Sequence, residues 1–378
     1  MKVIVTICRL LVGFLFIFSG LIKANDPLGF SYKLDEYFEI FHMPFLIPVT
    51  VYLAMFICIF EIVLGVMVLL GSYMRAATWL LLLMIIFFTF LTGYSAVSGK
   101  VTDCGCFGDA IKLKPWESFW KDIILLVLIL VLFVYRDRIT PLFRRPVTNA
   151  LLTFSFLITT AFTVYCYMYL PVKDFRPYHV GNDIRQQMTL PPTAKKDSTV
   201  TQLVYKNNAS GEEKGYTMDD LPWQDTVWMA NHAFVRQENK VIVEGDKPAI
   251  KDFSVWDAAN NDVTTRVLDS PVYKIWIVAY DLNKTNKRAF EKITRLAAEA
   301  ERNGIVTYGL TSTPYNVTDP FRHEVNAAFP FYYSDNVVLK TIVRANPGIV
   351  LLNGSRVIAM WHHNATPDID GVMKHVNK

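Results

Sequence analysis

Residues 76–97, AATWLLLLMIIFFTFLTGYSAV, contain no charged side chain. A helix needs about 20 apolar residues to cross the hydrocarbon core of a bilayer, so this stretch is long enough to span a membrane. Four other segments have a similar length and apolar character: Val3–Ile22, Pro48–Leu70, Ser118–Tyr135 and Val147–Leu170. The sequence therefore predicts an all-α transmembrane bundle, with a four-helix membrane domain over residues 1–146 and a fifth span over residues 147–170.

The composition agrees with a membrane protein that carries a second, water-exposed part. Of the 378 residues, 52% are hydrophobic, and these residues are concentrated before Leu170. The net charge is only +4, and no basic patch with interleaved aromatic residues occurs, so we expect no nucleic-acid partner. The five cysteines are too few and too scattered to form a disulfide framework, and none lies after position 170.

The first apolar segment could also be a secretory signal peptide, because it lies at the N-terminus after a lysine. Two features argue against cleavage. Arg9 interrupts the apolar run, and Lys23-Ala24-Asn25-Asp26 lacks the small-residue pattern of a cleavage site. We expect this segment to be retained as a helix.

Basic residues between the spans predict the orientation of the chain. The link between the fourth and fifth spans carries one aspartate and four arginines, Arg136, Arg138, Arg144 and Arg145. The first link, Asn25–Ile47, is mainly acidic. Because basic loops stay on the cytoplasmic side, we expect a multi-pass protein of the inner membrane with a cytoplasmic N-terminus. Residues 98–117 and everything after Leu170 then face the periplasm.

Two charged residues fall inside the apolar spans, where a charge costs roughly 2.5 to 3.5 kcal/mol on insertion scales. Arg9 lies in the first span and Glu61 in the second, and counting at ~1.5 Å per residue from their inner ends gives similar depths. We therefore predict that Arg9 and Glu61 form an intramembrane pair, which either fixes helix packing or serves as a proton or ligand site. Lys23 ends the first span, where it either extends to the membrane interface or lowers the pKa of a nearby thiol.

Residues 103–109, DCGCFGD, contain the only closely spaced cysteines and are named here the cysteine loop. Cys104 and Cys106 are candidates for a redox-active pair. Gly105 permits the unusual backbone that a disulfide between such close residues needs, and a strained disulfide exchanges easily. A structural turn or a static disulfide is the competing interpretation. In the oxidising periplasm either form is chemically accessible.

The two carboxylates of the cysteine loop, Asp103 and Asp109, are candidate modulators of the thiols. They are hard ligands and match a thiolate metal site poorly, so metal binding ranks third and we predict no metal site. Neither do we expect a cofactor. A small-molecule or quinone site near Glu61 has no independent support in the sequence.

The remainder of the chain divides into three regions. Residues 171–198 form a polar connector, and residues 199–247 form a small β-rich region whose aromatics Tyr216, Trp223 and Trp228 should fill a small core. Residues 248–378 alternate between strand and helix patterns and predict an α/β domain of thioredoxin-like plan. Its amphipathic helix should bury one face, formed by Phe290, Ile293, Leu296, Ala297 and Ala300.

The membrane half resembles the DoxX and MauE-like (methylamine-utilisation) family of small helical membrane proteins. The resemblance covers about the first 135 residues and rests on these motifs: Arg9-Leu10-Leu11-Val12-Gly13, Phe18-Ser19-Gly20-Leu21-Ile22-Lys23, Asp26-Pro27-Leu28-Gly29 with Tyr32-Lys33-Leu34, Glu61-Ile62-Val63-Leu64-Gly65 and Cys104-Gly105-Cys106-Phe107-Gly108-Asp109. It implies a four-helix membrane core linked to the maturation of envelope proteins and, by proposal, to disulfide chemistry.

The last 130 or so residues resemble a thioredoxin-like domain through their element order and through Asn346-Pro347. The resemblance implies that the bond before Pro347 is cis. Where thioredoxins carry a cysteine pair after the first strand, this chain has residues 281–286, DLNKTN. The domain therefore has no thiol for dithiol exchange, and its sequence favours binding.

Two functions follow from these features. The chain is an accessory protein that relays thiol and disulfide electrons through the cysteine loop, or it is a non-enzymatic membrane scaffold whose thioredoxin-like domain binds a periplasmic protein. The features do not identify an enzyme, and any enzymatic chemistry would be thiol–disulfide exchange. The expected partners are membrane lipid and a periplasmic or inner-membrane protein.

Overall fold

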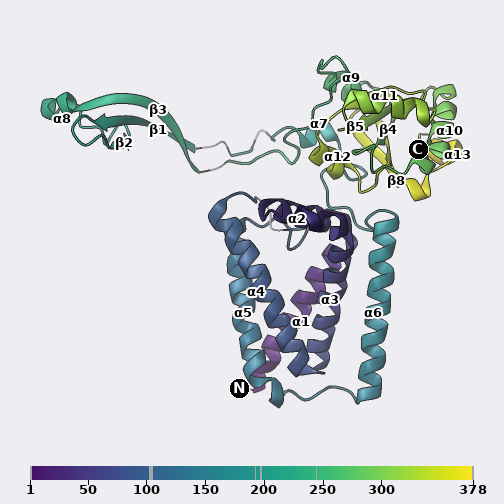
Figure 1. The fold of residues 1–378 in the computed structure, drawn as a ribbon, viewed down its shortest axis with the longest axis horizontal. Coiled ribbons are helices and arrows are strands. Elements are labelled where there is room, and N and C mark those ends of the chain that lie inside the picture. Colours follow the sequence, from purple (N-terminus) through teal and green to yellow (C-terminus); the bar gives the residue numbers. More distant parts are fainter. Residues whose placement is uncertain (1, 102–104, 192, 196–197, 244, 377–378) are drawn as a thin grey trace. The chain divides into compact units, whose positions relative to one another are not determined.

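The computed structural model describes residues 2–101, 105–191, 193–195, 198–243 and 245–376. It divides into two compact units, one made of Met1–Asp183 with Phe253–Lys378 and the other of Ile184–Asp252. Among the described residues, five helices are long and apolar enough to cross a membrane. They are α1 (Lys2–Asn25), α3 (Thr50–Leu70), α4 (Met74–Ser98), α5 (Pro115–Tyr135) and α6 (Arg145–Met168) (Figure 1). The five predicted spans are confirmed.

Helices α1 and α3 pack closely because small residues face each other at their crossing. A β-carbon on Gly65 would lie 2.8 Å from the carbonyl oxygen of Gly13, and one on Gly20 would lie 3.1 Å from the carbonyl oxygen of Cys58. Gly13 and Gly20 are two turns apart on α1, as Cys58 and Gly65 are on α3. These two contacts fix how far each helix is displaced along the other.

The link between α1 and α3 is helical, which the sequence patterns did not indicate. Asp26 caps helix α2 (Pro27–Ile40) by accepting a hydrogen bond of 2.8 Å from the backbone N–H of Gly29. Pro27 occupies the first position of the helix, where proline is favoured. The short 3₁₀ helix η1 (Pro44–Val49) follows, and α2 runs across the ends of the long helices (Figure 1).

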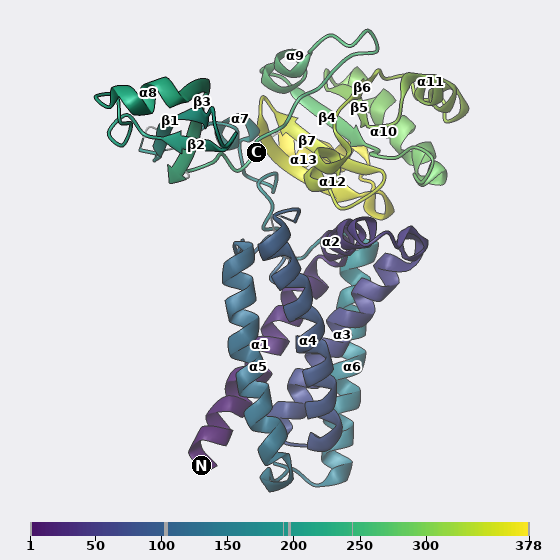
Figure 2. The ribbon, with the colours of Figure 1, turned by 60° about the vertical axis from the view of Figure 1, so that its left-hand side comes forward.

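The α/β domain is built on a five-stranded sheet with the order β6-β5-β4-β7-β8. Strands β4, β5 and β6 are parallel, whereas β7 is antiparallel to β4 and β8 is antiparallel to β7. The strands are β4 (Tyr273–Val278), β5 (Val306–Thr311), β6 (Phe331–Tyr333), β7 (Gly348–Asn353) and β8 (Arg356–His362); the first four are labelled in Figure 2 and β8 in Figure 1. This arrangement confirms the predicted fold class, a helical membrane bundle followed by an α/β domain.

Helices complete the α/β domain around the sheet. Helix α10 buries the five residues that the sequence pattern predicted, against Ile275 and Ile277 of β4 and Ile349 and Leu351 of β7. The helices, including the short 3₁₀ turns, are α9 (Thr264–Asp269), η3 (Lys287–Ala289), α10 (Phe290–Arg302), α11 (Tyr315–Glu324), α12 (Asn336–Ile342), η4 (His363–Ala365) and α13 (Ile369–Val376).

The unit Ile184–Asp252 contains a three-stranded antiparallel sheet with the order β2-β1-β3. Its elements are α7 (Ile184–Gln187), β1 (Ser198–Asn207), β2 (Glu213–Tyr216), α8 (Thr226–Asn231) and β3 (His232–Val243). Trp228 contacts the tilted ring of Tyr205, meets Tyr216 edge to face and stacks on His232. Trp223 was predicted to fill this small core, but 55% of its surface is exposed, so that prediction is wrong for Trp223.

Candidate functional site

A buried ion pair lies between α1 and α3. Lys23 Nζ pairs with Glu61 Oε1, and each residue exposes only 2% of its surface. The prediction that Glu61 pairs with Arg9 is therefore wrong. We name Lys23 and Glu61 the inner pair.

The packing of α1 on α3 explains why Arg9 does not reach Glu61. Because Gly20 lies against Cys58 and Gly13 against Gly65, Glu61 is level with the last third of α1, where Lys23 is. At about 1.5 Å per residue, Arg9 lies roughly 21 Å from Lys23 along the helix. The prediction assumed that both helices begin at one level, whereas α1 extends beyond the end of α3.

Lys23 does not extend to the membrane interface, contrary to the first of its two predicted roles. Its ammonium group lies 5.1 Å from the ring centroids of both Phe30 and Phe88, within the range of cation–π attraction. Glu61 neutralises the charge, and the two aromatic faces cover it. A buried charge is retained only when it is paired in this way.

A small cavity of about 30 Å³ lies next to the inner pair, which is room for about two water molecules. Ser19, Lys23, Glu61, Cys106, Lys121 and Asp122 contribute to its lining. Lys121 Nζ and Asp122 Oδ1 form a second ion pair at 2.8 Å on α5. Thr92 of α4 donates a hydrogen bond of 3.0 Å to the other carboxylate oxygen of Asp122. The cavity thus brings two ion pairs and Cys106 together.

Ser19 connects the inner pair to the cysteine loop. Its hydroxyl lies 3.3 Å from Glu61 Oε2 and 3.2 Å from the carbonyl oxygen of Cys106. A hydroxyl has a single proton, so Ser19 donates to one acceptor at a time. The Ser19 hydroxyl therefore links the Cys106 backbone to the Glu61 carboxylate.

The described part of the cysteine loop is a tight turn. Gly105 has a φ of +67°, a conformation that favours glycine, and the N–H of Gly108 donates to the carbonyl oxygen of Gly105 at 3.1 Å. Cys106 exposes 9% of its surface, and Phe107 lies against the ring of Phe18. Two predicted site residues, Asp103 and Cys104, lie outside the described residues, so the redox pair stays a prediction.

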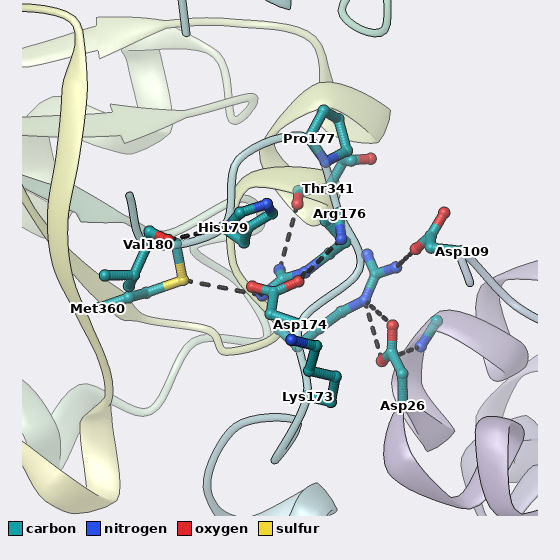
Figure 3. Close-up of polar contacts among 12 residues, drawn as sticks. Asp26, Asp109, Lys173, Asp174, Arg176, Pro177, His179, Val180, Thr341 and Met360 are labelled. Atoms are coloured by element: carbon teal, nitrogen blue, oxygen red, sulfur yellow. Dashed lines mark hydrogen bonds and ion pairs between the residues drawn. The ribbon is translucent and has the colours of Figure 1, made fainter. Parts of the chain in front are cut away.

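Arg344 holds the other end of the cysteine loop. Its Nε donates to both carboxylate oxygens of Asp26, at 3.0 and 2.8 Å, and its Nη2 donates to Asp109 Oδ2 at 2.9 Å. Asp26 and Asp109 are both drawn at this contact (Figure 3). We name these three residues the Arg344 clamp. Asp109, predicted to modulate the thiols, is an anchor for the arginine in this structure.

The clamp joins one guanidinium to two carboxylates and is largely shielded from water. Arg344 exposes 6% of its surface. Burial alone would lower the pKa of its guanidinium, but the carboxylates of Asp26 and Asp109 outweigh burial and raise the pKa above its ordinary value. Two carboxylates around one guanidinium form charge-assisted hydrogen bonds, which are stronger than those between neutral groups.

An aromatic contact lies beside the clamp. Tyr32 of α2 donates a hydrogen bond of 3.1 Å to Tyr280, which follows β4, and Lys340 Nζ lies 4.6 Å from the centroid of the Tyr32 ring. Burial raises the pKa of Tyr32, and the neighbouring Tyr280 adds to this effect. Burial also lowers the pKa of Lys340. These side chains extend the contact between α2 and the α/β domain.

The face of the α/β domain that makes these contacts includes the cis proline. The Asn346–Pro347 bond is cis, as predicted, and it follows Arg344 by two residues. Asn346 Nδ2 donates to the carbonyl oxygen of Asp281 at 2.8 Å. Asp281, which begins the segment of residues 281–286, therefore lies on the same face as Pro347 and the clamp.

The connector after α6 supports the same region. Arg176 donates through Nε and Nη2 to the two carboxylate oxygens of Asp174, at 2.8 and 2.6 Å, and through Nη1 to the carbonyl oxygen of Thr341 at 3.2 Å (Figure 3). Arg176 counteracts the effect of burial and holds the pKa of Asp174 below its ordinary value. Asn25 and Lys173 exchange two hydrogen bonds, of 2.7 and 3.0 Å.

Residues 1–135 match the family model described as methylamine utilisation protein MauE. This match and the five apolar helices make the chain a multi-pass membrane protein with a MauE-like region. The MauE-like region contains the inner pair, α2 and the cysteine loop. The DoxX part of the resemblance stays a prediction.

Two further likenesses are partial. Protein TlpB of Flavobacterium psychrophilum is 29% identical over 133 residues, which cover 33% of this chain and 35% of TlpB, so the chain spans about a third of that relative. The crystal structure of Arabidopsis thaliana ScoI with copper bound matches 33% of this chain and 96% of the ScoI chain, with 14% identity and a TM-score of 0.25.

Sequence reasoning missed Ser19, Tyr32, Arg344 and Tyr280 as site residues. Asp26-Pro27 was a detectable signal, because an aspartate before a proline commonly opens a helix. No comparable signal marks Arg344, whose partners are more than 200 positions away in the sequence. The cavity places Cys106 beside charged groups from α1, α3 and α5.

Proposed function

We propose that this chain is an accessory protein of the inner membrane that acts in the maturation or assembly of envelope proteins. In this proposal the N-terminus is cytoplasmic, and the cysteine loop and the α/β domain are periplasmic. The arginines between α5 and α6 support this orientation, since positively charged links stay in the cytoplasm. The periplasm permits cysteine oxidation, which the cysteine loop needs for redox chemistry.

The observation that carries the proposal is that the cysteine loop is held from two sides. The inner pair reaches Cys106 through Ser19, and the Arg344 clamp reaches Asp109 from the α/β domain. Such fixation suits a loop whose chemistry depends on its position, because small displacements of reacting groups cost much of their reactivity. A turn that merely joins α4 to α5 needs no contact with a distant domain.

The chemistry that we propose is dithiol–disulfide exchange with a disulfide-bonded envelope protein. The thiolate of one loop cysteine attacks a sulfur of the partner's disulfide and forms a mixed disulfide, and the partner's second sulfur leaves as a thiolate. The other loop cysteine then attacks the mixed disulfide and closes the Cys104–Cys106 disulfide. Two electrons pass to the partner, and its two thiolates take up the protons that the loop thiols release.

A scaffold is the second candidate function, and one observation favours it. Residues 171–378 contain no cysteine, and the cis-proline face of the α/β domain is occupied by α2 and the cysteine loop. In this alternative the loop is an anchor for Arg344, and its thiols do not react. The two functions differ in whether Cys104 and Cys106 are chemically required.

Glutathione disulfide is a simple probe for this difference. The full reduced chain in detergent should close an intramolecular disulfide and release two glutathione molecules per chain. The variants Cys104→Ser and Cys106→Ser should each stop at a mixed disulfide that mass spectrometry detects, and Cys166→Ser is the matched control. In cells, the two single variants should also form reductant-sensitive adducts with envelope proteins.

The relay would be refuted if the wild-type chain formed no Cys104–Cys106 disulfide with glutathione disulfide. It would also be refuted if neither single variant formed adducts in cells. Either result, with the α/β domain still docked, would favour the scaffold.

A further inference from the structure

Arg9 is a charged residue without a partner in an apolar helix. No hydrogen bond or ion pair joins it to any residue that the structure describes, and its Nε is buried. The side chain as a whole is only partly buried, so its terminal nitrogens remain accessible. Charged residues in membrane spans are almost always paired, which makes an unpaired arginine evidence for a missing anion.

The surroundings of Arg9 place it at the end of the bundle. A β-carbon on Gly71, which ends α3, would lie 2.9 Å from Arg9 Nη1 and 2.9 Å from the carbonyl oxygen of Thr140. The segment with Thr140 is joined to α3 by a hydrogen bond of 3.0 Å from Leu142 N–H to the Leu70 carbonyl oxygen. Arg9 therefore lies where α3 ends and the chain leaves the bundle. In the membrane orientation proposed above, this end of the bundle lies at the level of the lipid headgroups.

A second unpaired arginine lies at the same end. Arg136 begins the 3₁₀ turn η2 (Arg136–Arg138) directly after α5, and its Nε and Nη1 are buried without a hydrogen-bond partner. Its guanidinium lies 4.1 Å from the centroid of the Phe133 ring. The turn packs against α4, and Arg75 at the start of α4 donates to Asp137 at 2.8 Å.

The charge at this end is strongly unbalanced. Asp137 is the only carboxylate among residues 136–148, and Arg75 already binds it. The arginines of this end are Arg9, Arg75, Arg136, Arg138, Arg144 and Arg145. The planar guanidinium group matches the geometry of phosphate, which it binds through two parallel hydrogen bonds. Phosphate is also the anion that a bilayer supplies at this level.

We propose that Arg9 and Arg136 bind the phosphate of an anionic phospholipid headgroup at the end of α3 and α5. The inference is independent of the cysteine loop and of the proposed redox function. It explains why an arginine persists in α1 roughly 21 Å from the inner pair, since its partner is a lipid and not a side chain. Basic groups at the ends of membrane helices recognise anionic headgroups in the same manner.

The test uses the full chain in a neutral detergent, titrated with short-chain phosphatidylglycerol, short-chain phosphatidylcholine or inorganic phosphate. Binding is followed by the rise in melting temperature and by lipid retained in native mass spectrometry. The variants are Arg9→Gln, Arg9→Lys and Arg136→Gln. Arg144→Gln is the matched control, because it removes one charge from an exposed arginine at the same end.

Phosphatidylglycerol should bind the wild type more tightly than phosphatidylcholine does, and Arg9→Gln and Arg136→Gln should each weaken its binding about five- to ten-fold. Arg144→Gln should change it less than two-fold. Arg9→Lys keeps the charge and protects the test against a folding failure of Arg9→Gln, and we expect an intermediate loss.

Three results would overturn the proposal. Unchanged phosphatidylglycerol binding by the folded Arg9 variants would show that the negative end of the α3 dipole alone balances Arg9. An equal loss in Arg144→Gln would show a general charge effect. Equal stabilisation by inorganic phosphate would identify a soluble anion as the ligand in place of a lipid.

Discussion

The two charged contacts that hold the cysteine loop differ in their surroundings. The inner pair lies within the helical bundle, where Lys23 and Glu61 are almost completely buried. The Arg344 clamp lies outside the apolar spans, and the side chains of Asp26 and Asp109 are 17% and 26% exposed. The first contact is closed off from bulk solvent apart from a small cavity beside it, whereas the carboxylates of the second are partly exposed to solvent.

This difference indicates different roles for the two contacts. A buried pair is costly to break, since removal of one partner leaves an uncompensated charge, so the inner pair suits a permanent fixture of the bundle. A clamp next to water can open and close, because water can solvate the separated groups. We therefore expect the inner pair to fix Cys106 and the clamp to control access to the loop.

The largest effect should come from breaking the inner pair. Glu61→Gln leaves Lys23 charged and buried, and we expect a loss of about 3–5 kcal/mol in the free energy of unfolding, measured by denaturation in a neutral detergent. Glu36→Gln is the control. It removes a carboxylate from the partly exposed Lys33–Glu36 pair and should cost less than ~1 kcal/mol.

The double variant Lys23→Met/Glu61→Gln tests whether the loss comes from the unpaired charge. It should recover most of the stability, because neither position then carries an unpaired buried charge. A double variant as unstable as Glu61→Gln would contradict this explanation.

The second largest effect should come from breaking the Arg344 clamp. Arg344→Gln removes the guanidinium from two carboxylates, and we expect the contact between α2 and the α/β domain to weaken by about 2–3 kcal/mol. Hydrogen exchange of the amides in Pro27–Ile40 should become faster, while exchange in α10 should stay unchanged. Arg322→Gln, which breaks a more exposed pair with Asp319 in the same domain, is the control and should leave α2 unaffected.

Removing the hydrogen bond between Tyr32 and Tyr280 should weaken the contact between α2 and the α/β domain by a smaller amount. Tyr32→Phe removes only the hydroxyl that donates to Tyr280, and we expect a loss of about 1 kcal/mol from the same contact. The hydrogen exchange of α2 again provides the measurement. Tyr315→Phe changes an exposed tyrosine of the α/β domain and should have no effect. Equal effects of the two variants would show that the Tyr32 hydroxyl does not support docking.

The smallest effect should be on the stability of the fold at low pH, through the Asp174 carboxylate. The folded-state pKa of Asp174 lies below its ordinary value of 3.8 because of Arg176, so the folded state favours the charged carboxylate. The resulting stabilisation is fully present above the ordinary pKa and is lost as the pH falls through the lower, folded-state pKa. Asp174→Asn should abolish this part of the acid dependence in denaturation between about pH 5 and pH 2. An unchanged profile would contradict the pairing with Arg176.

Local patterns in the sequence were sufficient to predict much of the fold. Apolar length predicted all five spans, and the 3.6-residue period predicted the buried face of α10. The short helix α2 was missed because its sequence is neither long nor strongly amphipathic, and packing on the bundle supports it instead.

Contacts between distant parts of the chain could not be obtained in the same way. The partner of Glu61 depends on how far α1 is displaced along α3, and the close approach of Gly13 to Gly65 decides this. Counting residues from the ends of two helices cannot reveal that displacement. Arg344 is similar, since only the folded domain brings it to Asp26 and Asp109.

The reactivity of Cys106 tests the central claim that the clamp controls access to the cysteine loop. In a chain with Cys8, Cys58, Cys104 and Cys166 replaced by serine or alanine, the rate of alkylation by a water-soluble maleimide reports access to Cys106 alone. We expect slow alkylation in this parent and in its Arg322→Gln derivative, and an increase of about ten-fold in the Arg344→Gln derivative, which corresponds to ~1.4 kcal/mol. An Arg344→Gln derivative that is alkylated as slowly as the parent would contradict the account.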